Sequence, residues 1–249
     1  AYISFSMLIK IRIFFVTLLT TLIDLITFYP KLKKAIIQNL GHPPQLVLDI
    51  GGNKGQSISF FLKLNNNTII YSFEPLKSHY NHLVMKYKSF DNITISKKGI
   101  SSHIGKKRFY ENILDLTSSF EKLDYDSEYL KYKTKILGVE LKDIVKNEYD
   151  VDVITLNSFI KDNIESNIDI IKIDVEGHEY ECLKGLFSEP ISPSIHLIQL
   201  EYHNDDMYKN RISFNKINEI LDKNNFQLVK RLKHGFGDFE DLLYKNKSK

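Results

Sequence analysis

The chain has 249 residues, of which 43% are hydrophobic and 26% charged, enough for one large domain or two small ones with a substantial core. These numbers exclude a disordered tail and a small disulfide-stapled protein. Lys and Arg total 34 against 31 Asp and Glu, so the net charge of +3 lacks the basic surplus typical of nucleic-acid binding, and no nucleic-acid partner is expected. The single cysteine, Cys182, excludes an intramolecular disulfide and favours a reducing compartment, so we expect a cytoplasmic protein.

The most apolar stretch of the chain, residues 7–29, predicts an N-terminal helix. Its charge-free run, residues 13–23, is shorter than the about 20 residues that a membrane-spanning helix needs, and no small-residue cleavage site of a secretory signal follows. Polar residues recur every three to four positions and form one narrow stripe of this helix: Thr17, Thr20, Thr21, Asp24, Thr27 and Lys31. Two interpretations stay open: the helix packs on the globular domain, or it lies in a membrane surface with Lys10 and Arg12 facing the headgroups. Whether Ala1 is the true N-terminus also stays open, because a start other than Met suits a fragment or a processed product as well.

After the turn signal Gly-His-Pro-Pro at 41–44 the pattern changes, which divides the chain into a helical segment, 1–40, and a second domain, 41–249. Continuous apolar runs predict buried strands at 46–50, 68–73, 92–96, 169–174 and 195–201. Amphipathic runs predict helices at 56–64, 76–88, 178–187 and 212–222, and an antiparallel pair follows at 226–232 and 239–245. This alternation predicts a doubly wound α/β domain with a mostly parallel sheet.

The segment 101–152 is polar and rich in Tyr and Lys, and it is too long to be only a connection. We predict that it forms a lid over the acceptor, with short edge strands at 106–110 (KKRFY) and 135–139 (KILGV).

Residues 49–55, Asp-Ile-Gly-Gly-Asn-Lys-Gly, place a glycine-rich turn between a buried strand and a helix. Glycines let the backbone approach a ligand closely, and a helix N-terminus offers free N–H groups. Glu74 ends the second strand, nineteen residues after Gly55, where a carboxylate can accept both hydroxyls of a ribose. The spacing therefore favours a cofactor that contains adenosine.

The dinucleotide fingerprint G-x-G-x-x-G is absent, because Asn53 and Gln56 stand where an alignment on Gly51 requires glycine. The acid at the end of the first strand, Asp49, instead suits S-adenosylmethionine (SAM). This cofactor has no pyrophosphate, and its ammonium group benefits from a carboxylate reached through water.

Residues 171–179, Ile-Lys-Ile-Asp-Val-Glu-Gly-His-Glu, form another strand that ends in acids just before a helix. Carboxylates at the carboxyl ends of parallel strands face the crevice where α/β proteins bind ligands. Because side chains alternate along an extended chain, we expect that Asp174 and Glu176 do not both point into the pocket. The next strand ends in a second acidic cluster, 201–206, which includes His203 and should neighbour the first.

Four segments resemble the FkbM-type methyltransferases, a family of class I SAM-dependent enzymes: VLDIGGNKGQ, YSFEP, DVITLNSF and IDIIKIDVEGHEYECLKG. The resemblance covers about residues 45–203. It implies a seven-stranded Rossmann-like sheet of strand order 3-2-1-4-5-7-6 with the last strand antiparallel, and methyl transfer to oxygen, commonly on sugars or sugar-bearing natural products. The family often has Ala at the position of Gly52 and an acid at the position of Asn157, and the N-terminal helix lies outside the resemblance.

Carried over position by position, the resemblance implies a set of cofactor-binding residues: Asp49, Gly51, Asn53 and Gly55 in the first loop, Glu74 as the ribose-binding acid, and Asp174 beside the methyl donor.

Methyl transfer is an in-line displacement by a hydroxyl oxygen, so much of the catalysis comes from positioning, but a neutral alcohol also needs a base. The bases expected at the mouth of the site are Asp174, His178, Glu201 and His203. We predict that Asp174 positions donor and acceptor while His178 or His203 takes the proton; each histidine also has a plain structural interpretation. A Mg²⁺ ion held by Asp174, Glu201 and His203 is possible, although the sequence does not require it.

Three functions stay open on the sequence alone. The first is O-methylation of a small-molecule or glycan acceptor. The second is N-methylation of a macromolecule, against which the near-neutral charge and the absence of an Asn/Asp-Pro-Pro-Tyr/Phe motif count. The third is a non-catalytic, membrane-attached binding protein with a relic fold, against which the intact Asp49, Glu74 and Asp174 count.

Other reactive side chains are expected to be structural. Cys182 falls on the inward face of its helix, and we predict that it belongs to the core. His79 and His82 fall on a polar helix face and are expected to be solvated.

Overall fold

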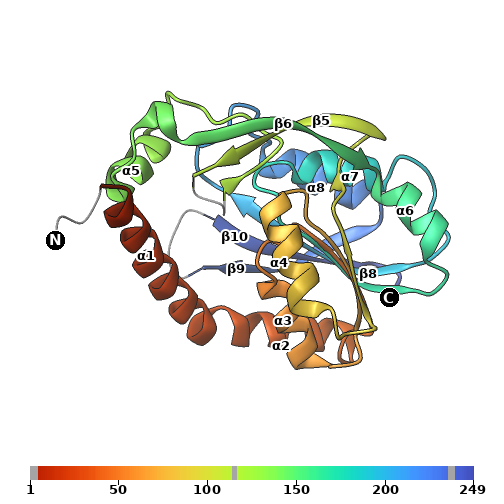
Figure 1. Cartoon of the computed structure of the whole chain (residues 1–249). Coiled ribbons are helices and arrows are strands. Elements are labelled where there is room, and N and C mark those ends of the chain that lie inside the picture. Colours follow the sequence, from red (N-terminus) through yellow and green to blue (C-terminus); the bar gives the residue numbers. More distant parts are fainter. Residues whose placement is uncertain (1–4, 114–116, 235–238) are drawn as a thin grey trace.

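A seven-stranded sheet forms the centre of the molecule, with helices on both of its faces (Figure 1). The computed structural model describes residues 5–113, 117–234 and 239–249. The strands of this sheet have the following bounds: β1 Leu46–Ile50, β2 Ile69–Phe73, β3 Ile93–Ser96, β7 Ile168–Ile173, β8 Ile195–His203, β9 Phe226–Lys233 and β10 Phe239–Asn246.

A smaller three-stranded sheet, of order β4-β6-β5, lies over one side of the central sheet (Figure 1). Its strands are β4 Gly99–Ile100, β5 Gly105–Asn112 and β6 Val145–Ile154. The helices have the following bounds: α1 Phe5–Thr27, α2 Tyr29–Leu40, α3 Gln56–Leu64, α4 Lys77–Tyr87, α5 Glu128–Leu137, α6 Leu156–Asn163, α7 Glu179–Leu186 and α8 Phe214–Lys223.

The strand order of the central sheet is β3-β2-β1-β7-β8-β10-β9. Numbered along the chain within this sheet, it reads 3-2-1-4-5-7-6, and β10 is antiparallel to both of its neighbours while the other pairs are parallel. The predicted fold class and strand order are confirmed. The chain reverses its direction of winding between β1 and β7, which is the switch point where α/β proteins bind ligands.

The core has two layers because the sheet is covered on both faces. Alternate residues of β1 divide between them: Leu48 packs with α6, α7 and α8, whereas Val47 packs with α2, α3 and α4. All five residues of β1 are buried. This double burial explains why the strands read as continuous apolar runs. Cys182 is fully buried in the first layer, as predicted.

The segment 101–152 contains more regular structure than its sequence predicts. The edge strand at 106–110 is confirmed as part of β5, which pairs along β6. The strand predicted at 135–139 is wrong, because residues 135–137 end α5 and Gly138 closes this helix in the left-handed conformation (φ 70°). The Ser127 hydroxyl caps the other end of α5 by accepting from the N–H of Leu130. Whether this segment acts as a lid stays a prediction.

The polar pattern of α4 predicted that both of its histidines are solvated, which is wrong for one of them. His82 is exposed, as predicted, but His79 is only 5% exposed. His79 lines a cleft together with residues of the small sheet and of the chain after β2, which the polar pattern of its own helix does not reveal.

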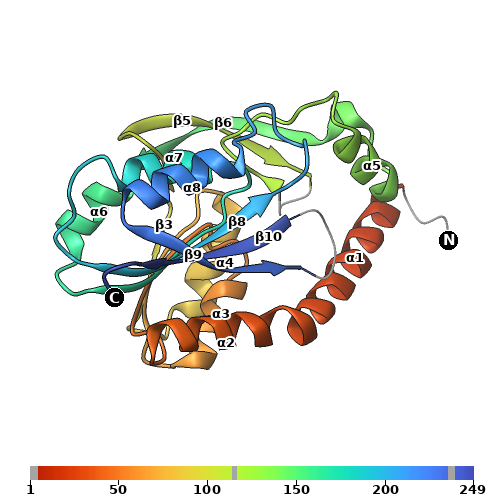
Figure 2. The same cartoon turned by 180° about the vertical axis from the view of Figure 1, so that it is seen from behind.

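Helix α1 extends away from the central sheet, from α2 toward α5 (Figure 2). Its described apolar side chains are largely exposed. Whether the helix lies on the domain or on a membrane surface stays a prediction. The side chains of Lys10, Arg12 and Thr17 lie outside the described residues. Within the described part of the chain, no helix combines the length and apolarity that crossing a bilayer requires.

Candidate active site

Two sequence motifs meet where β1 and β7 end. The N–H of Asp174 donates to the carbonyl of Ile50 at 3.0 Å, and Gly51 follows with a left-handed φ of 88°. A Cβ atom on Gly51 would lie 1.8 Å from the carbonyl oxygen of Asp174. Only glycine permits this approach, so the first glycine of the loop brings the two acidic motifs together.

A cleft opens at this switch point. The loop after β1, the end of β2, the small sheet and the turn after β7 all contribute to its walls, with these residues among them: Gly51, Asn53, Glu74, Phe120, Asp174 and Glu176.

Four of the six predicted cofactor residues line the cleft: Gly51, Asn53, Glu74 and Asp174. Asp49 and Gly55 do not. Gly55 begins α3 with a φ of 82°, and its carbonyl accepts from the hydroxyl of Tyr87 at 3.0 Å, so its role is to shape the loop.

Glu74 has the geometry of an acid prepared for a ribose. One carboxylate oxygen accepts from the N–H of Leu76 at 2.8 Å and the other from the N–H of Asn53 at 2.7 Å. Burial raises the pKa of Glu74, although these two backbone N–H groups oppose the shift. Since a carboxylate offers about four acceptor positions, Glu74 can still accept two hydroxyls.

Asp49 lies behind the loop rather than in the cleft. Its side chain is fully buried, and one oxygen accepts from the Ser72 hydroxyl at 2.8 Å. The other oxygen is 3.8 Å from Nζ of Lys172, which also donates to Asp174 at 2.9 Å. Asp49 therefore holds β1, β2 and β7 together and acts on the cleft only through Lys172.

The turn after β7 brings both of its acids into the cleft, contrary to the prediction from strand alternation. Glu176 and Gly177 both adopt left-handed backbone conformations, with φ of 56° and 93°. The Glu179 carboxylate accepts the N–H of Gly177, and the Ser119 hydroxyl donates to the carbonyl of Glu176. The strand has ended at Ile173, so its alternation no longer applies, and Asp174 and Glu176 line the same wall.

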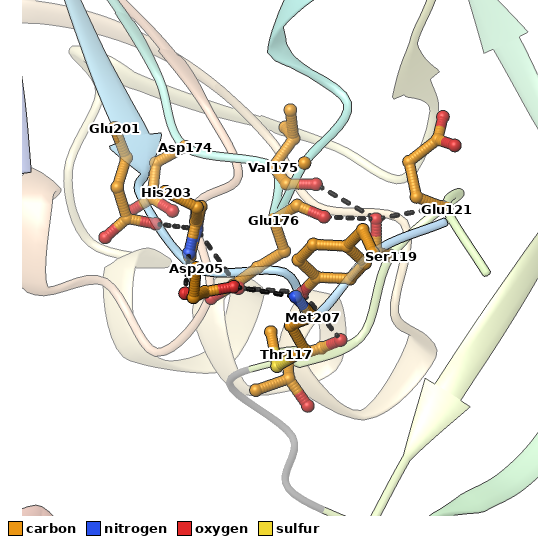
Figure 3. A network of polar contacts seen from close by, with 12 residues as sticks. Thr117, Ser119, Glu121, Asp174, Val175, Glu176, Glu201, His203, Asp205 and Met207 are labelled. Carbon is orange, nitrogen blue, oxygen red and sulfur yellow. Dashed lines mark hydrogen bonds and ion pairs between the residues drawn. The ribbon is translucent and has the colours of Figure 1, made fainter. Parts of the chain in front are cut away.

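The second acidic cluster neighbours the first, as predicted. Figure 3 shows Asp174, Glu201, His203 and Asp205 together at the carboxyl ends of β7 and β8. His203 Nε2 lies 3.0 Å from Glu201 and 3.5 Å from Glu176, and its Nδ1 lies 3.4 Å from Asp205. One imidazole is thus surrounded by three carboxylates.

These contacts shift the pKa values of the groups in the cluster in different directions. Burial acts to lower the pKa of His203, but the Glu201 charge and the other acids outweigh it and raise this pKa well above its usual value. Burial also acts to raise the pKa of Asp174, but Lys172 outweighs it and holds this pKa below its usual value. Burial raises the pKa of Glu176, and burial together with the Asp174 charge raises that of Glu201 to about 8.

The predicted proton acceptors fit this geometry poorly. The acids around His203 raise its pKa and favour the protonated imidazole, which has no lone pair for a further proton. His178 is fully buried, with Nδ1 at 2.7 Å from Glu121 and Nε2 at 3.0 Å from the Ser101 hydroxyl. Burial lowers the pKa of His178, and both ring nitrogens tie the segment 101–152 to α7. We therefore assign His178 a positioning role.

The predicted magnesium triad is not assembled as expected. Among the described residues, the groups of side chains close enough to share an ion include Glu176, Glu201 and His203, with Glu176 in the position predicted for Asp174. This set offers two carboxylates and one imidazole nitrogen. Mg²⁺ prefers oxygen ligands. A metal stays a prediction from the sequence that this geometry does not support.

Two polar groups of the cleft have free hydrogen-bonding positions that suit SAM. Asn53 Oδ1 is buried and has no hydrogen-bond partner among the described residues. Such an atom implies a ligand donor, because buried polar groups are otherwise paired. It lies beside Glu74, whose carboxylate can accept two more hydrogen bonds. The strand order and this cleft at the switch point define a class I SAM-dependent methyltransferase.

The chain belongs to the FkbM methyltransferase family. The family model described as Methyltransferase FkbM domain matches residues 49–228. A 2-O-methyltransferase, NoeI, of Sinorhizobium fredii (strain NBRC 101917 / NGR234) is 22% identical over 218 residues, which cover 87% of this chain and 85% of NoeI. The protein is therefore a SAM-dependent methyltransferase.

Two solved structures show similarity at low sequence identity. Magnesium protoporphyrin IX methyltransferase from Synechocystis PCC 6803 with bound SAM aligns with a TM-score of 0.48 and 12% identity over 88% of this chain and 77% of that chain. The Methanococcus jannaschii fibrillarin pre-rRNA processing protein aligns with a TM-score of 0.47 and 12% identity over 85% and 70%.

Three residues of the site were missed on the sequence. Lys172 lies within a strand, where a charge in an otherwise apolar run signals a buried ion pair. Tyr208 donates to Glu176 at 2.9 Å, and His79 lines the cleft near Glu74. The sequence carries no signal for these two, since both depend on elements that are distant along the chain.

Proposed function

We propose that the enzyme methylates a hydroxyl of a sugar, a glycan or a glycosylated natural product. The observation that carries this proposal is the pair of acids in the cleft, Asp174 with a lowered pKa and Glu176 with a raised one. Two carboxyl groups with different pKa values can divide the orientation and the deprotonation of a hydroxyl between them. The name of the relative NoeI, a 2-O-methyltransferase, supports oxygen as the acceptor atom.

When bound, SAM supplies the electrophilic methyl group. Asp174 is ionised at neutral pH, so it accepts a hydrogen bond from the acceptor hydroxyl and orients the oxygen. Glu176 takes the hydroxyl proton, because its raised pKa brings it closer to the operating pH. The Tyr208 hydroxyl and the protonated His203 both face Glu176 and favour its ionised form before the proton arrives.

The two cations of the cluster keep this acidic site from repelling itself. Lys172 lies against Asp174, and His203 lies between Glu176 and Glu201. In this arrangement His203 is a positioning residue that fixes two carboxyl groups, and proton transfer is left to Glu176.

The test is transfer of a labelled methyl group from SAM to a panel of acceptors: oligosaccharides, glycosides, peptides and RNA. We expect label on a sugar hydroxyl, stable to treatments that remove esters. Glu176→Gln should lower kcat about 100-fold or more, in the range of general-base effects, and should leave SAM affinity nearly unchanged. Glu128→Gln, on the exposed face of α5, is the matched control. Label found only on nitrogen, or full turnover in Glu176→Gln, would contradict the proposal.

A further inference from the structure

Helix α1 presents an apolar surface to the outside. Seven of its side chains are between 42% and 76% exposed: Phe14, Phe15, Leu18, Leu19, Leu22, Leu25 and Ile26. At 100° per residue they fall within one arc of about 140° of the helix surface. A helix that covers a protein core turns such an arc inward, whereas α1 turns its apolar arc outward.

Asp24, on the polar side of α1, faces the protein. Asp24 is half-buried, and its carboxylate lies 3.2 Å from Nδ1 of His234. The His234 ring also stacks on Phe28, with ring centroids 3.8 Å apart, and Phe28 belongs to the core. These contacts fix the rotation of the helix about its axis, so the apolar arc is held outward by specific pairing.

The charge around this arc is positive. Residues 5–40 contain five Lys or Arg and one acid, and that acid is the inward-facing Asp24. Lys31, Lys33 and Lys34 are exposed on the first turns of α2, directly after α1. A second copy of the chain would bring two such basic segments together, whereas anionic lipid headgroups would attract them.

We propose that α1 docks in the plane of an anionic membrane surface, with its apolar arc among the acyl chains and the lysines of α2 at the headgroups. The docked side is the side of the active site. His234 follows β9, which runs parallel to β8, so Asp24 is anchored at the sheet edge where the cleft opens. The membrane would therefore hold the enzyme with this edge close to the bilayer. This proposal does not depend on the identity of the methyl acceptor.

The experiment is co-sedimentation of the full chain with vesicles of phosphatidylcholine mixed with phosphatidylserine, and with vesicles of pure phosphatidylcholine. The test variant, Phe15→Glu with Leu22→Glu, changes two exposed side chains at the centre of the arc. The control variant, Val84→Glu with Met85→Glu, changes two exposed apolar side chains of α4. Circular dichroism and SAM binding report whether each variant remains folded.

We expect the full chain and the control variant to sediment with the anionic vesicles, more weakly at high salt and with pure phosphatidylcholine. The affinity of the α1 variant for these vesicles should be lower by about ten-fold or more. Three results would overturn the proposal: no vesicle binding by the full chain, equal binding by the α1 variant, or a concentration-dependent dimer in sedimentation velocity that the α1 variant abolishes. The last result would assign the arc to a second copy of the chain.

Discussion

Replacement of Lys172 by methionine removes the cation that joins the two acidic motifs. Nζ of Lys172 lies 2.9 Å from Asp174 and 3.8 Å from Asp49, and Asp49 is fully buried. Methionine preserves much of the side-chain volume but removes the cation that the two carboxylates share. Loss of one partner of a buried ion pair costs about 3–5 kcal/mol. Because one third of the Asp174 side chain is exposed, we expect about 3 kcal/mol, at the lower end of this range.

The loss should depend on pH, with a defined sign. Burial already raises the pKa of Asp49, and removal of Lys172 should raise it further. Protonation of the folded variant relieves the penalty, so the difference from the wild-type protein should shrink as the pH falls through this raised pKa. The largest possible slope is about 1.4 kcal/mol per pH unit for each carboxyl group.

The assay is urea-induced unfolding followed by circular dichroism, at about pH 7.5 and about pH 5.5. The matched control is Lys184→Met, which removes a partly exposed ion pair with Glu181 and should cost about 0–1 kcal/mol. Adding Asp49→Asn to Lys172→Met should recover part of the loss. A cost of less than about 1 kcal/mol for Lys172→Met, at both pH values, would refute the view that Lys172 compensates both acids.

Three further perturbations test separate parts of the structure. Tyr208→Phe removes a donor to Glu176 and should raise the pKa of this acid, which moves the acidic limb of the kcat/KM profile to higher pH; an unmoved limb would argue against Glu176 as the base. His234→Gln should destabilise the protein by about 1 kcal/mol in thermal unfolding near neutral pH. Burial acts to lower the pKa of His234, but Asp24 and a second acid raise it to about 10, so its contribution is complete below about 6.5 and should fade as the pH rises toward 10; a constant difference would be the opposing result. Thr155→Ala removes the N-cap of α6 and should cost about 1 kcal/mol by urea unfolding, whereas no change would mean that packing alone holds this helix end.

Most of the central sheet could be predicted because its strands are buried on both faces. Such strands read as continuous apolar runs, and β1 coincides with its predicted range. The strand order came from the family resemblance. Strand β6 was missed because it depends on a partner: it pairs along β5, and its exposed, charged residues carry no clear pattern. Helices α5 and α6 were missed although both begin at local caps, Ser127 and Thr155.

The candidate site was predictable in its location but not in its division of roles. Acids at the ends of two strands of a parallel sheet had to meet at one edge, and they do. The role of each histidine depends on partners that spacing does not reveal. His178 contacts Glu121, which is 57 residues away, and His203 is protonated because three carboxylates from two segments surround it. The alternation rule failed at Glu176 because a turn with left-handed residues replaces the strand there.

The orientation of α1 was the least predictable feature. The structure turns the apolar arc outward and Asp24 of the polar stripe toward the protein, although Thr21 and Thr27 of this stripe are exposed. The reason is a single long-range contact, Asp24 with His234, across 210 residues of sequence. No local pattern reports such a contact.

The most direct test of the central claim is calorimetric titration of the protein with SAM and with its demethylated product, beside NAD. We predict that both SAM and its product bind and that NAD does not. Glu74→Gln should weaken SAM binding by about 1–3 kcal/mol, or about 5- to 150-fold, because a buried ribose hydrogen bond is lost. Glu128→Gln should bind as the wild-type protein does. Absence of binding to folded protein, or equal affinity in Glu74→Gln, would contradict the assignment of this cleft as the cofactor site.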